Sequence, residues 1–200
     1  MRYRAKTLCV QIKAPASPVK RGRRPRSGTT LVPLKKAGVD PVTAMTFSSV
    51  QEAIGFARAA KAAAIPVVVC CIVARGGRRI GLWTIEEAIT RVDAATGAAP
   101  AYYMINCTHP TEFEPGLTPG DWTLRLGGFM PNAVAMETLD LCKLGHLEDG
   151  DPAELGGQLA QLSRRFAHVN VWGGCCGTDS RHIGQITRQV GEIRAAATVA

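Results

Sequence analysis

Apolar residues recur along the chain from residue 34 onward in two alternating spacings. Short uninterrupted apolar runs predict buried β-strands, and longer stretches with apolar residues three or four positions apart predict amphipathic helices. The strands are expected at residues 42–45, 66–73, 101–107, 124–132 and 169–172, and the helices at residues 48–64, 84–95, 133–144, 152–166 and 180–197.

Capping residues and helix breakers support these boundaries. Thr84 and Asp151 are suitable N-caps, and Pro152 suits the first position of a helix. Three prolines between residues 108 and 122 predict a loop there, and Gly127–Gly128 is expected to interrupt the fourth strand.

The alternation of strands and helices predicts an α/β fold with a parallel sheet. We expect a (β/α)8 TIM-barrel type rather than a doubly wound sheet, because candidate chemical groups follow strands and the GxGxxG fingerprint is absent. A closed barrel has eight strand–helix units in about 250 residues. Five units in 200 residues therefore predict an incomplete barrel, whose open edges would favour self-association.

The net charge of +8 comes from the first part of the chain. Residues 1–39 carry eleven Lys or Arg and no acidic residue, which leaves 13 basic and 16 acidic residues beyond. We expect residues 1–33 to be a basic, disordered segment rich in Pro and Gly, and residues 34–200 to form the domain. The segment could bind nucleic acid by counterion release. A solvated tail, or residues translated from a displaced start, is favoured because no aromatic residues interleave with the charges.

The cysteine count and the apolar content indicate a cytoplasmic protein. Seven cysteines, an odd number, do not resemble a secreted disulfide framework, and Cys9 and Cys142 are expected to be unpaired. Cys70 and Cys71 lie in a continuously apolar run and are expected in the core. With 46% apolar residues the chain can bury a sizeable core, but no apolar run is long enough to span a membrane, and no secretory signal is recognisable.

Two motifs carry the candidate chemistry. MINCTHP at residues 104–110 and VNVWGGCCGTD at residues 169–179 each consist of a short apolar strand that ends at thiols, namely Cys107, Cys175 and Cys176. Carboxyl ends of parallel strands meet at one edge, so three thiolates could share a metal ion if the glycines let the chain turn at the Cys–Cys pair. Three protein ligands leave a tetrahedral position open, as in catalytic zinc sites. From the residues alone, a metal site and small buried hydrophobes remain alternatives.

The GGCC motif, together with Asn-Cys at the end of an earlier strand, resembles the homocysteine S-methyltransferase family. The resemblance covers about residues 38–195, including residues 42–60, 91–110 and 177–186. It implies that Cys107, Cys175 and Cys176 hold Zn2+ and that homocysteine and a methyl donor, S-methylmethionine being favoured, yield methionine.

Several other residues flank the ligands that the resemblance implies. Thr46, Asn106 and Thr178 are expected to orient the ligands or contact the substrate, and Thr108 and Asp179 are further candidates. His109 and His182 are equally well explained as histidines without a role in the site.

Three departures from the family pattern keep other functions open. Many members have Glu-Thr where this chain has Met45–Thr46, the segment after Val73 lacks acidic residues, and the first barrel units are missing. The alternatives are a catalytically inactive zinc-binding homologue, from a truncated or frame-shifted copy, and a nucleic-acid-associated protein that acts through residues 1–36.

Overall fold

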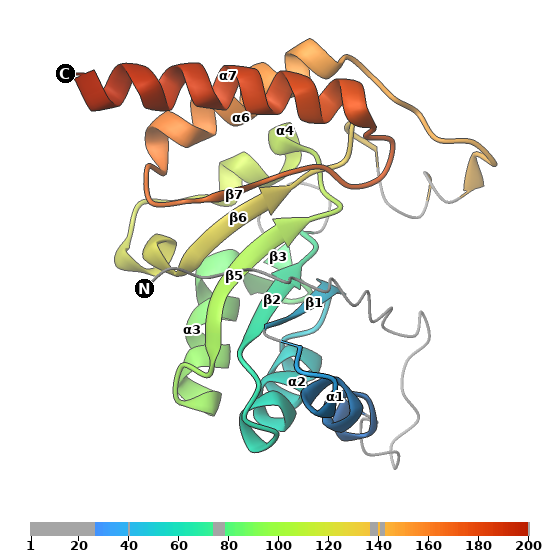
Figure 1. Ribbon diagram of the computed structural model, residues 1–200, viewed down its shortest axis with the longest axis vertical. Coiled ribbons are helices and arrows are strands. Elements are labelled where there is room, and N and C mark those ends of the chain that lie inside the picture. The colour runs from blue at the N-terminus through green and yellow to red at the C-terminus, as the bar shows by residue number, and fades with distance from the viewer. Residues whose placement is uncertain (1–26, 40, 74–78, 137–139, 141–142, 200) are drawn as a thin grey trace.

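The computed structural model describes residues 27–39, 41–73, 79–136, 140 and 143–199. Its main sheet contains the five parallel strands β1 (Val42–Phe47), β2 (Val67–Cys71), β5 (Pro100–Asn106), β6 (Leu126–Met130) and β7 (Val171–Trp172) in the order β1-β2-β5-β6-β7 (Figure 1). A separate two-stranded hairpin, β3 (Arg79–Ile80) with β4 (Trp83–Thr84), follows β2.

The strand order distinguishes a barrel-type sheet from a doubly wound sheet. A doubly wound sheet reverses its strand order at a switch point, whereas the strands of a barrel follow one another around the axis. Here every strand of the main sheet lies beside the next one along the chain, without reversal. The predicted parallel α/β fold is confirmed. In the part of the chain that the structure describes, β1 and β7 each pair on one side only, so the sheet does not close there.

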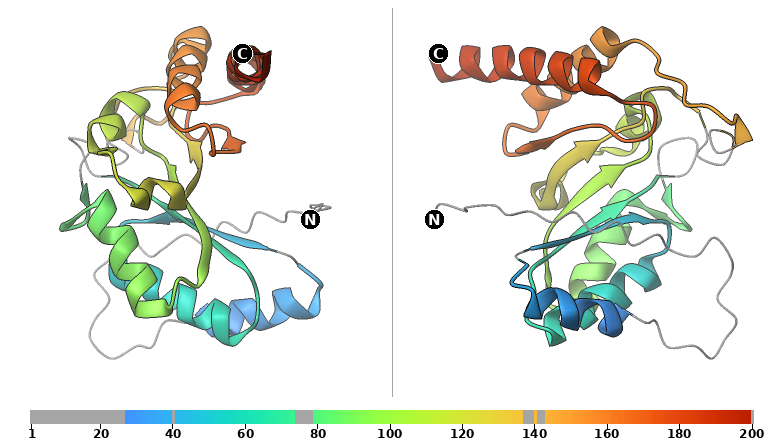
Figure 2. Two further views of the ribbon diagram at one scale, coloured as in Figure 1. Left: turned by 90° about the vertical axis from the view of Figure 1, so that its left-hand side faces the viewer. Right: turned by 45° about the vertical axis from the view of Figure 1, so that its right-hand side comes forward.

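Helices follow one another around one face of the sheet, from α1 and α2 at one end to α6 and α7 at the other (Figures 1 and 2). They are α1 (Ser27–Lys36), α2 (Val50–Ala62), α3 (Ile85–Thr96), α4 (Pro110–Phe113), α6 (Pro152–Arg165) and α7 (Ser180–Val199). The predicted caps are confirmed: Thr84 forms a capping box with Glu87, and Asp151 accepts hydrogen bonds from the amides of Ala153 and Glu154. None of the described helices has the length and apolar character needed to cross a bilayer.

Strand β2 is buried on both faces, as its continuous apolar sequence predicts. Its alternate residues Val67, Val69 and Cys71 belong to the main core cluster, which also contains the buried residues of the helices. Val68 and Cys70 belong to a second, smaller cluster with Met45 and Met104. Side chains alternate between the faces of a strand, so the second cluster lies on the sheet face opposite the first. The core placement of Cys70 and Cys71 is confirmed, and burial raises the pKa of the Cys71 thiol to about 12.

A polar network joins α3 to the amino ends of β5 and β6. Arg125 forms a bidentate ion pair with Asp93 at 2.8 and 3.1 Å and donates to the Pro100 carbonyl at 2.7 Å. The Tyr103 hydroxyl donates to Asp93 at 2.7 Å. The network lies at the amino ends of the strands, whereas the thiols lie at the carboxyl ends. We therefore assign the network to stability.

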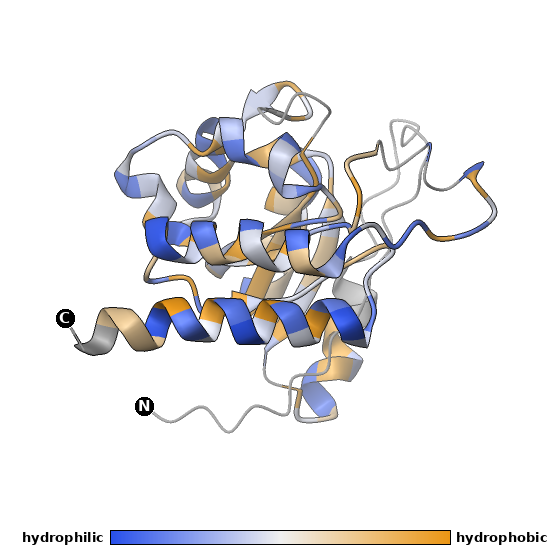
Figure 3. Ribbon diagram, turned by 90° about the horizontal axis from the view of Figure 1, so that it is seen from above, coloured by the Kyte–Doolittle hydropathy of each residue, from blue (hydrophilic) through white to orange (hydrophobic). Residues whose placement is uncertain are grey.

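Helix α7 only partly follows its predicted apolar stripe. Hydrophobic and hydrophilic residues alternate along it (Figure 3), and Ile186 and Val190 are buried. Ile193 packs against the core at its margin, whereas Ile183 is 44% exposed. The stripe therefore begins one turn later than the sequence suggests.

The segment between β5 and β6 is wrongly predicted as a loop over residues 108–122. It contains α4 and two 3-10 helices, Glu114–Gly116 and Asp121–Arg125. Proline is favourable at the first helical position, where its missing N–H would have no intrahelical partner. Pro110 occupies that position in α4, so this proline begins a helix instead of preventing one.

Strand β6 runs through Gly127–Gly128, and the predicted interruption is limited to an irregularity in its pairing with β5 between Leu126 and Gly128. A Cβ atom at Gly127 would collide with the Tyr102 ring, and one at Gly128 would lie 2.7 Å from both Met104 and Val171. The two glycines therefore allow large side chains of neighbouring strands to cross over β6.

The helix predicted over residues 133–144 does not begin at Ala133. Residues 133–135 form bends, and the Ala133 amide donates to the Cys176 carbonyl at 2.9 Å. This bond holds the chain in a non-helical course. Residues 137–139 and 141–142, with Cys142, lie outside the described residues.

The expected disordered segment includes residues that are helical in the structure. Helix α1 covers residues 27–36, and Leu31 on it is completely buried in the main core cluster. Burial of apolar side chains outweighs the weak helical signal of this stretch. Residues 1–26, on which the predictions of disorder and of nucleic-acid binding mainly rest, and Cys9 lie outside the described residues.

Candidate metal centre

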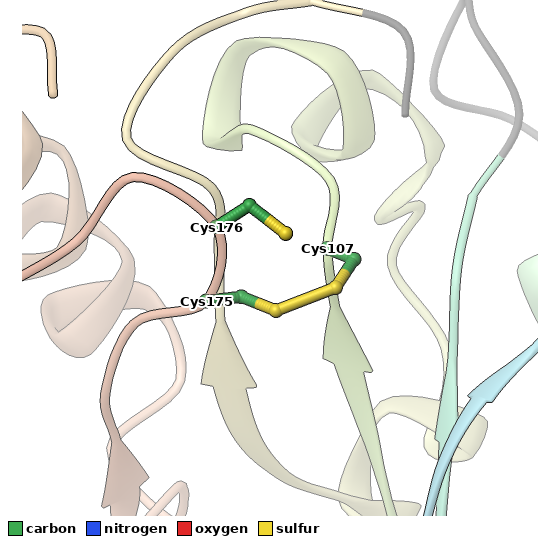
Figure 4. Close-up of side chains that lie close together, drawn as sticks. All are labelled: Cys107, Cys175 and Cys176. Carbon is green, nitrogen blue, oxygen red and sulfur yellow. A yellow bond between two sulfur atoms is a disulfide. The ribbon is translucent and has the colours of Figure 1, made fainter. Parts of the chain in front are cut away.

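Cys107 follows the last residue of β5 and leaves the strand direction at once. Its φ of 53° is left-handed, which is uncommon for a residue with a side chain. Its amide donates to the Met130 carbonyl at 3.1 Å. The buried Cys107 side chain is thereby turned toward the loop that follows β7 (Figure 4).

Cys175 and Cys176 lie in a tight turn after β7. Thr178 closes the turn, because both its amide (3.1 Å) and its hydroxyl (2.7 Å) donate to the Cys175 carbonyl. Gly177 has a φ of 79°, and a Cβ atom there would collide with the Glu148 carbonyl oxygen. Only glycine fits this turn, and the turn allows both cysteines of the pair to face the same point.

The three thiols converge. All three Sγ atoms lie within 4.8 Å of one another, and Cys107 and Cys175 are joined as a disulfide, with their Cα atoms 5.5 Å apart (Figure 4). Cys176 points its sulfur toward the same space. A disulfide sulfur cannot act as a thiolate ligand, so a metal ion would bind the reduced form of this site.

The segment Met130–Ala133, which begins with the last residue of β6, connects the three cysteines through their backbones. Three of its bonds are between main chains: Cys107 N to Met130 O (3.1 Å), Cys175 N to Pro131 O (2.7 Å) and Ala133 N to Cys176 O (2.9 Å). Two more come from the Asn132 side chain, which donates to the Cys107 carbonyl at 3.0 Å and accepts from the Cys176 amide at 3.2 Å. Asn132 is not among the site residues predicted from the sequence. A polar residue at a strand end between the two ligand-bearing strands was the available signal.

Asn106 and Thr46 are brought together. The completely buried Asn106 amide group donates to the Thr46 hydroxyl at 3.0 Å and accepts from the Thr46 amide at 3.2 Å. Thr46 has a left-handed φ of 70°, at an irregularity in the β1–β2 pairing. This pair fixes the end of β1 relative to β5 at the same edge of the sheet as the thiols.

The remaining predicted neighbours mainly hold the backbone. The buried Thr108 hydroxyl accepts from the Val73 amide at 3.0 Å. His109 is the N-cap of α4 and its Nδ1 lies 2.8 Å from the Thr111 hydroxyl, while burial lowers the pKa of its imidazole. The cap explains His109 without a role at the thiols.

Asp179 and His182 tie the turn to the loop before α6. His182 is completely buried; its Nδ1 lies 3.0 Å from Asp179 and its Nε2 lies 2.6 Å from the Asp149 carbonyl. Arg181 pairs with both Asp149 and Asp179 at 2.5 and 2.8 Å. The Arg181 guanidinium, and after it His182, hold the pKa of the Asp179 carboxyl below its usual value. These residues brace the cysteine turn from outside.

The donor set fits zinc. Sulfur atoms of three thiolates on one tetrahedral zinc ion stand about 3.8 Å apart, since each Zn–S bond is about 2.3 Å. The 4.8 Å limit within which the three sulfurs lie is compatible with that spacing after small side-chain rotations. Within the described part of the chain this is the only such group of three or more His, Cys, Asp and Glu side chains.

Comparison with known proteins identifies the family of the chain. Curated proteins give no significant match to this chain. The family model described as homocysteine S-methyltransferase matches residues 25–190, a span that contains the three cysteines and all five strands of the main sheet. On this match, the chain belongs to the homocysteine S-methyltransferase family.

Proposed function

We propose that Cys107, Cys175 and Cys176 bind Zn2+ as thiolates and that the chain uses this site to transfer a methyl group to homocysteine, forming methionine. The convergence of three thiols from two strand ends is the observation that carries the proposal. The family's reaction is methyl transfer to homocysteine, and S-methylmethionine or a similar sulfonium is the donor we favour.

Zinc bound here would supply an open fourth position at which a substrate thiol is held as thiolate near neutral pH. The chain's own residues set the geometry around that position. The Met130–Ala133 segment fixes the backbones of all three cysteines, and Thr178 holds the turn at Cys175. Rate in methyl transfer depends on alignment, and a misplacement of about 1 Å can cost on the order of a hundredfold.

Among the residues that the structure describes, two candidates for binding the amino group of homocysteine, at positions 45 and 179, supply no free charge. Met45, at the end of β1, is buried with Val68, Cys70 and Met104, so its apolar side chain cannot pair with an ammonium group. Asp179, close to Cys176 in sequence, is occupied by Arg181 and His182. We therefore expect homocysteine to bind mainly through its sulfur. Because the ligands must be reduced thiolates, we propose a reducing compartment, the cytoplasm, as the site of action.

Metal analysis of the reduced protein tests zinc binding. We expect about one zinc ion per chain in the wild type and a large loss in each of Cys107→Ser, Cys175→Ser and Cys176→Ser. Cys70→Ala is the matched control, since Cys70 is a buried cysteine of strand β2 and not of the trio. Full occupancy in Cys175→Ser together with loss in Cys70→Ala would contradict the ligand assignment.

Methionine formation from homocysteine tests the reaction, with S-methylmethionine, S-adenosylmethionine and betaine offered separately. We expect slow turnover with the zinc-loaded chain, because in the described residues only five strand ends contribute loops around the site. Zinc binding without any methionine would favour the alternative, a non-catalytic zinc-binding homologue. Turnover near one per second, within the ordinary range for enzymes, would show that these loops suffice.

A further inference from the structure

A loop that precedes α6 packs against the outer side of the cysteine turn. Residues Glu148–Gly150, which we call the clamp loop, have no regular secondary structure and lie beside the chain that enters α7 (Figure 1). The Glu148 carbonyl oxygen occupies the space in which a Cβ atom of residue Gly177 would stand. At the other end of the loop, a Cβ atom at Gly150 would lie 2.7 Å from the Ala133 carbonyl oxygen. The clamp loop therefore contacts both the turn and the segment after β6.

His182 attaches the clamp loop to the turn. It lies in the first turn of α7, and its completely buried ring places Nε2 2.6 Å from the Asp149 carbonyl oxygen. A carbonyl oxygen only accepts, so Nε2 carries the hydrogen of this bond. Nδ1 faces Asp179, whose amide nitrogen lies at 3.1 Å and whose carboxylate oxygen lies at 3.0 Å. A neutral ring accepts from that amide and a protonated ring donates to that carboxylate, so His182 holds Asp179 in either state.

The ion pairs around the clamp loop attach it less firmly. Arg181 pairs with both Asp149 and Asp179, but all three side chains are about half exposed, and exposed ion pairs contribute little. Within the clamp loop itself, Asp149 and Gly150 are exposed. Loops with few buried contacts open locally at low cost. The buried imidazole is thus the strongest attachment between this loop and the turn.

We propose that the clamp loop restrains the cysteine turn from its outer side and that His182 is the positioning residue for this restraint. On its inner side the turn is bonded to the Met130–Ala133 segment. Without His182 the turn keeps those inner bonds but loses its outer support. Cys175 and Cys176 then gain freedom to move relative to Cys107, and the three sulfurs converge less tightly.

The first test measures zinc affinity and therefore rests on the proposed function. Residues that orient metal ligands commonly contribute about 10- to 100-fold to affinity, and because His182 acts one step further out we expect a loss of about tenfold for His182→Phe. Chelator competition on reduced protein measures it. Tyr103→Phe is the matched control, since it also replaces a buried polar ring by phenylalanine and removes a hydrogen bond, to Asp93 at the amino ends of the strands. Its zinc affinity should equal that of the wild type.

A second readout needs no metal. In reduced, metal-free protein, iodoacetamide alkylates thiols at rates that depend on their accessibility and thiolate character. Peptide mass spectrometry follows Cys175 and Cys176 together, and in His182→Phe this pair should react severalfold faster than in the wild type. Cys70 and Cys71 are buried in β2 and report unfolding of the whole chain in the same sample. Their rates should not change.

A glycine substitution displaces the clamp loop without altering His182, and it tests the proposal even if His182→Phe does not fold. Gly150→Ala places a methyl group against the Ala133 carbonyl and requires a left-handed φ. Gly145→Ala is the control, because Gly145 is also left-handed but its Cβ would meet open space. We expect Gly150→Ala to lower zinc affinity and to speed alkylation of the cysteine pair, and Gly145→Ala to do neither.

The outcomes separate this proposal from the proposed function. Wild-type affinity and wild-type alkylation in folded His182→Phe or Gly150→Ala would overturn the role of the clamp loop, and so would equal effects in Tyr103→Phe or Gly145→Ala. A wild type that binds no zinc, combined with faster alkylation of the cysteine pair in His182→Phe, would refute the zinc function and leave the role of the clamp loop standing.

Discussion

The Asn106 amide group binds the amide and the hydroxyl of Thr46 across strand β2, which separates their two strands in the sheet. Neighbouring strands lie about 4.8 Å apart, so the ends of β1 and β5 would be nearly 10 Å apart in a flat sheet. A direct contact between them requires the sheet to curve toward this side, as the strands of a barrel do.

Asn106→Ala should destabilise the protein by about 1–3 kcal/mol, because it leaves the half-buried polar groups of Thr46 without their Asn106 partners. Urea unfolding measures the change. Asn170→Ala, at an exposed asparagine, should stay within about 0.5 kcal/mol of the wild type. Equal stability of the two variants would mean that the Asn106–Thr46 contact does not support the fold.

Gly177→Ala should reduce both stability and metal binding. The new Cβ would require a left-handed φ and would collide with the Glu148 carbonyl, which together should cost at least 1–3 kcal/mol, on the order of other strained sites. Gly184→Ala is the matched control, because a Cβ there meets open space on helix α7. Thermal unfolding should show Gly184→Ala as stable as the wild type or up to about 1 kcal/mol more stable.

Stability should fall at alkaline pH. The pKa of Cys71 is raised to about 12 by burial, and that of Tyr103 is raised by burial and by its bond to Asp93. A raised pKa in the folded state stabilises the fold fully below the unfolded pKa, and this stabilisation is lost as pH rises toward the folded value.

For Cys71 the loss should therefore begin near pH 9 and continue to about pH 12, with a slope of up to about 1.4 kcal/mol per pH unit. Urea unfolding at a series of pH values measures the slope. Cys71→Ala should lower stability at pH 7 by about 1 kcal/mol for the lost packing and should show a shallower decline above pH 9. An unchanged slope would contradict the assignment to Cys71.

Oxidation should abolish metal binding. The Cys107–Cys175 disulfide removes two of the three thiolate ligands. The one thiolate that remains cannot form a tetrahedral zinc site with protein ligands. We expect about one zinc ion per chain after reduction and close to none after oxidation with oxidised glutathione, with recovery on treatment with a thiol reductant. Cys107→Ser should lose zinc in both states. Zinc retained in the oxidised wild type would rule out this ligand set.

The sequence predicted the strands, their parallel order and the convergence of the thiols because these features follow from local signals. Val67–Cys71 is continuously apolar, and Cys107 and Cys175 end apolar runs, so their position in a parallel sheet brings them to one edge. The caps at Thr84 and Asp151 were likewise readable from residue type.

Features that depend on tertiary contacts were not predictable in this way. Gly127 resembles a strand breaker in the sequence, but in the structure it leaves room for the Tyr102 ring of the neighbouring strand. Ala133 begins a helical pattern in the sequence, but in the structure its amide donates to the Cys176 carbonyl, and this bond depends on a distant segment. The position of Asn132 at a strand end was readable from the sequence, but its two partners were not, because the backbone groups of Cys107 and Cys176 belong to distant segments and no spacing along the chain indicates them.

The separation of 68 residues between Cys107 and Cys175 gives the site a second effect, on chain entropy. Any bond between these residues, direct or through a shared ion, closes a loop that contains β6, α6 and β7. In the chain-entropy model, closing a loop of this length stabilises the folded state by about 4 kcal/mol at 25 °C. The segments from α1 to β2 lie outside the loop and gain nothing directly. The chemical state of the thiols thus sets how firmly residues 107–175 are folded relative to the segments outside the loop, which also include α3 and α7.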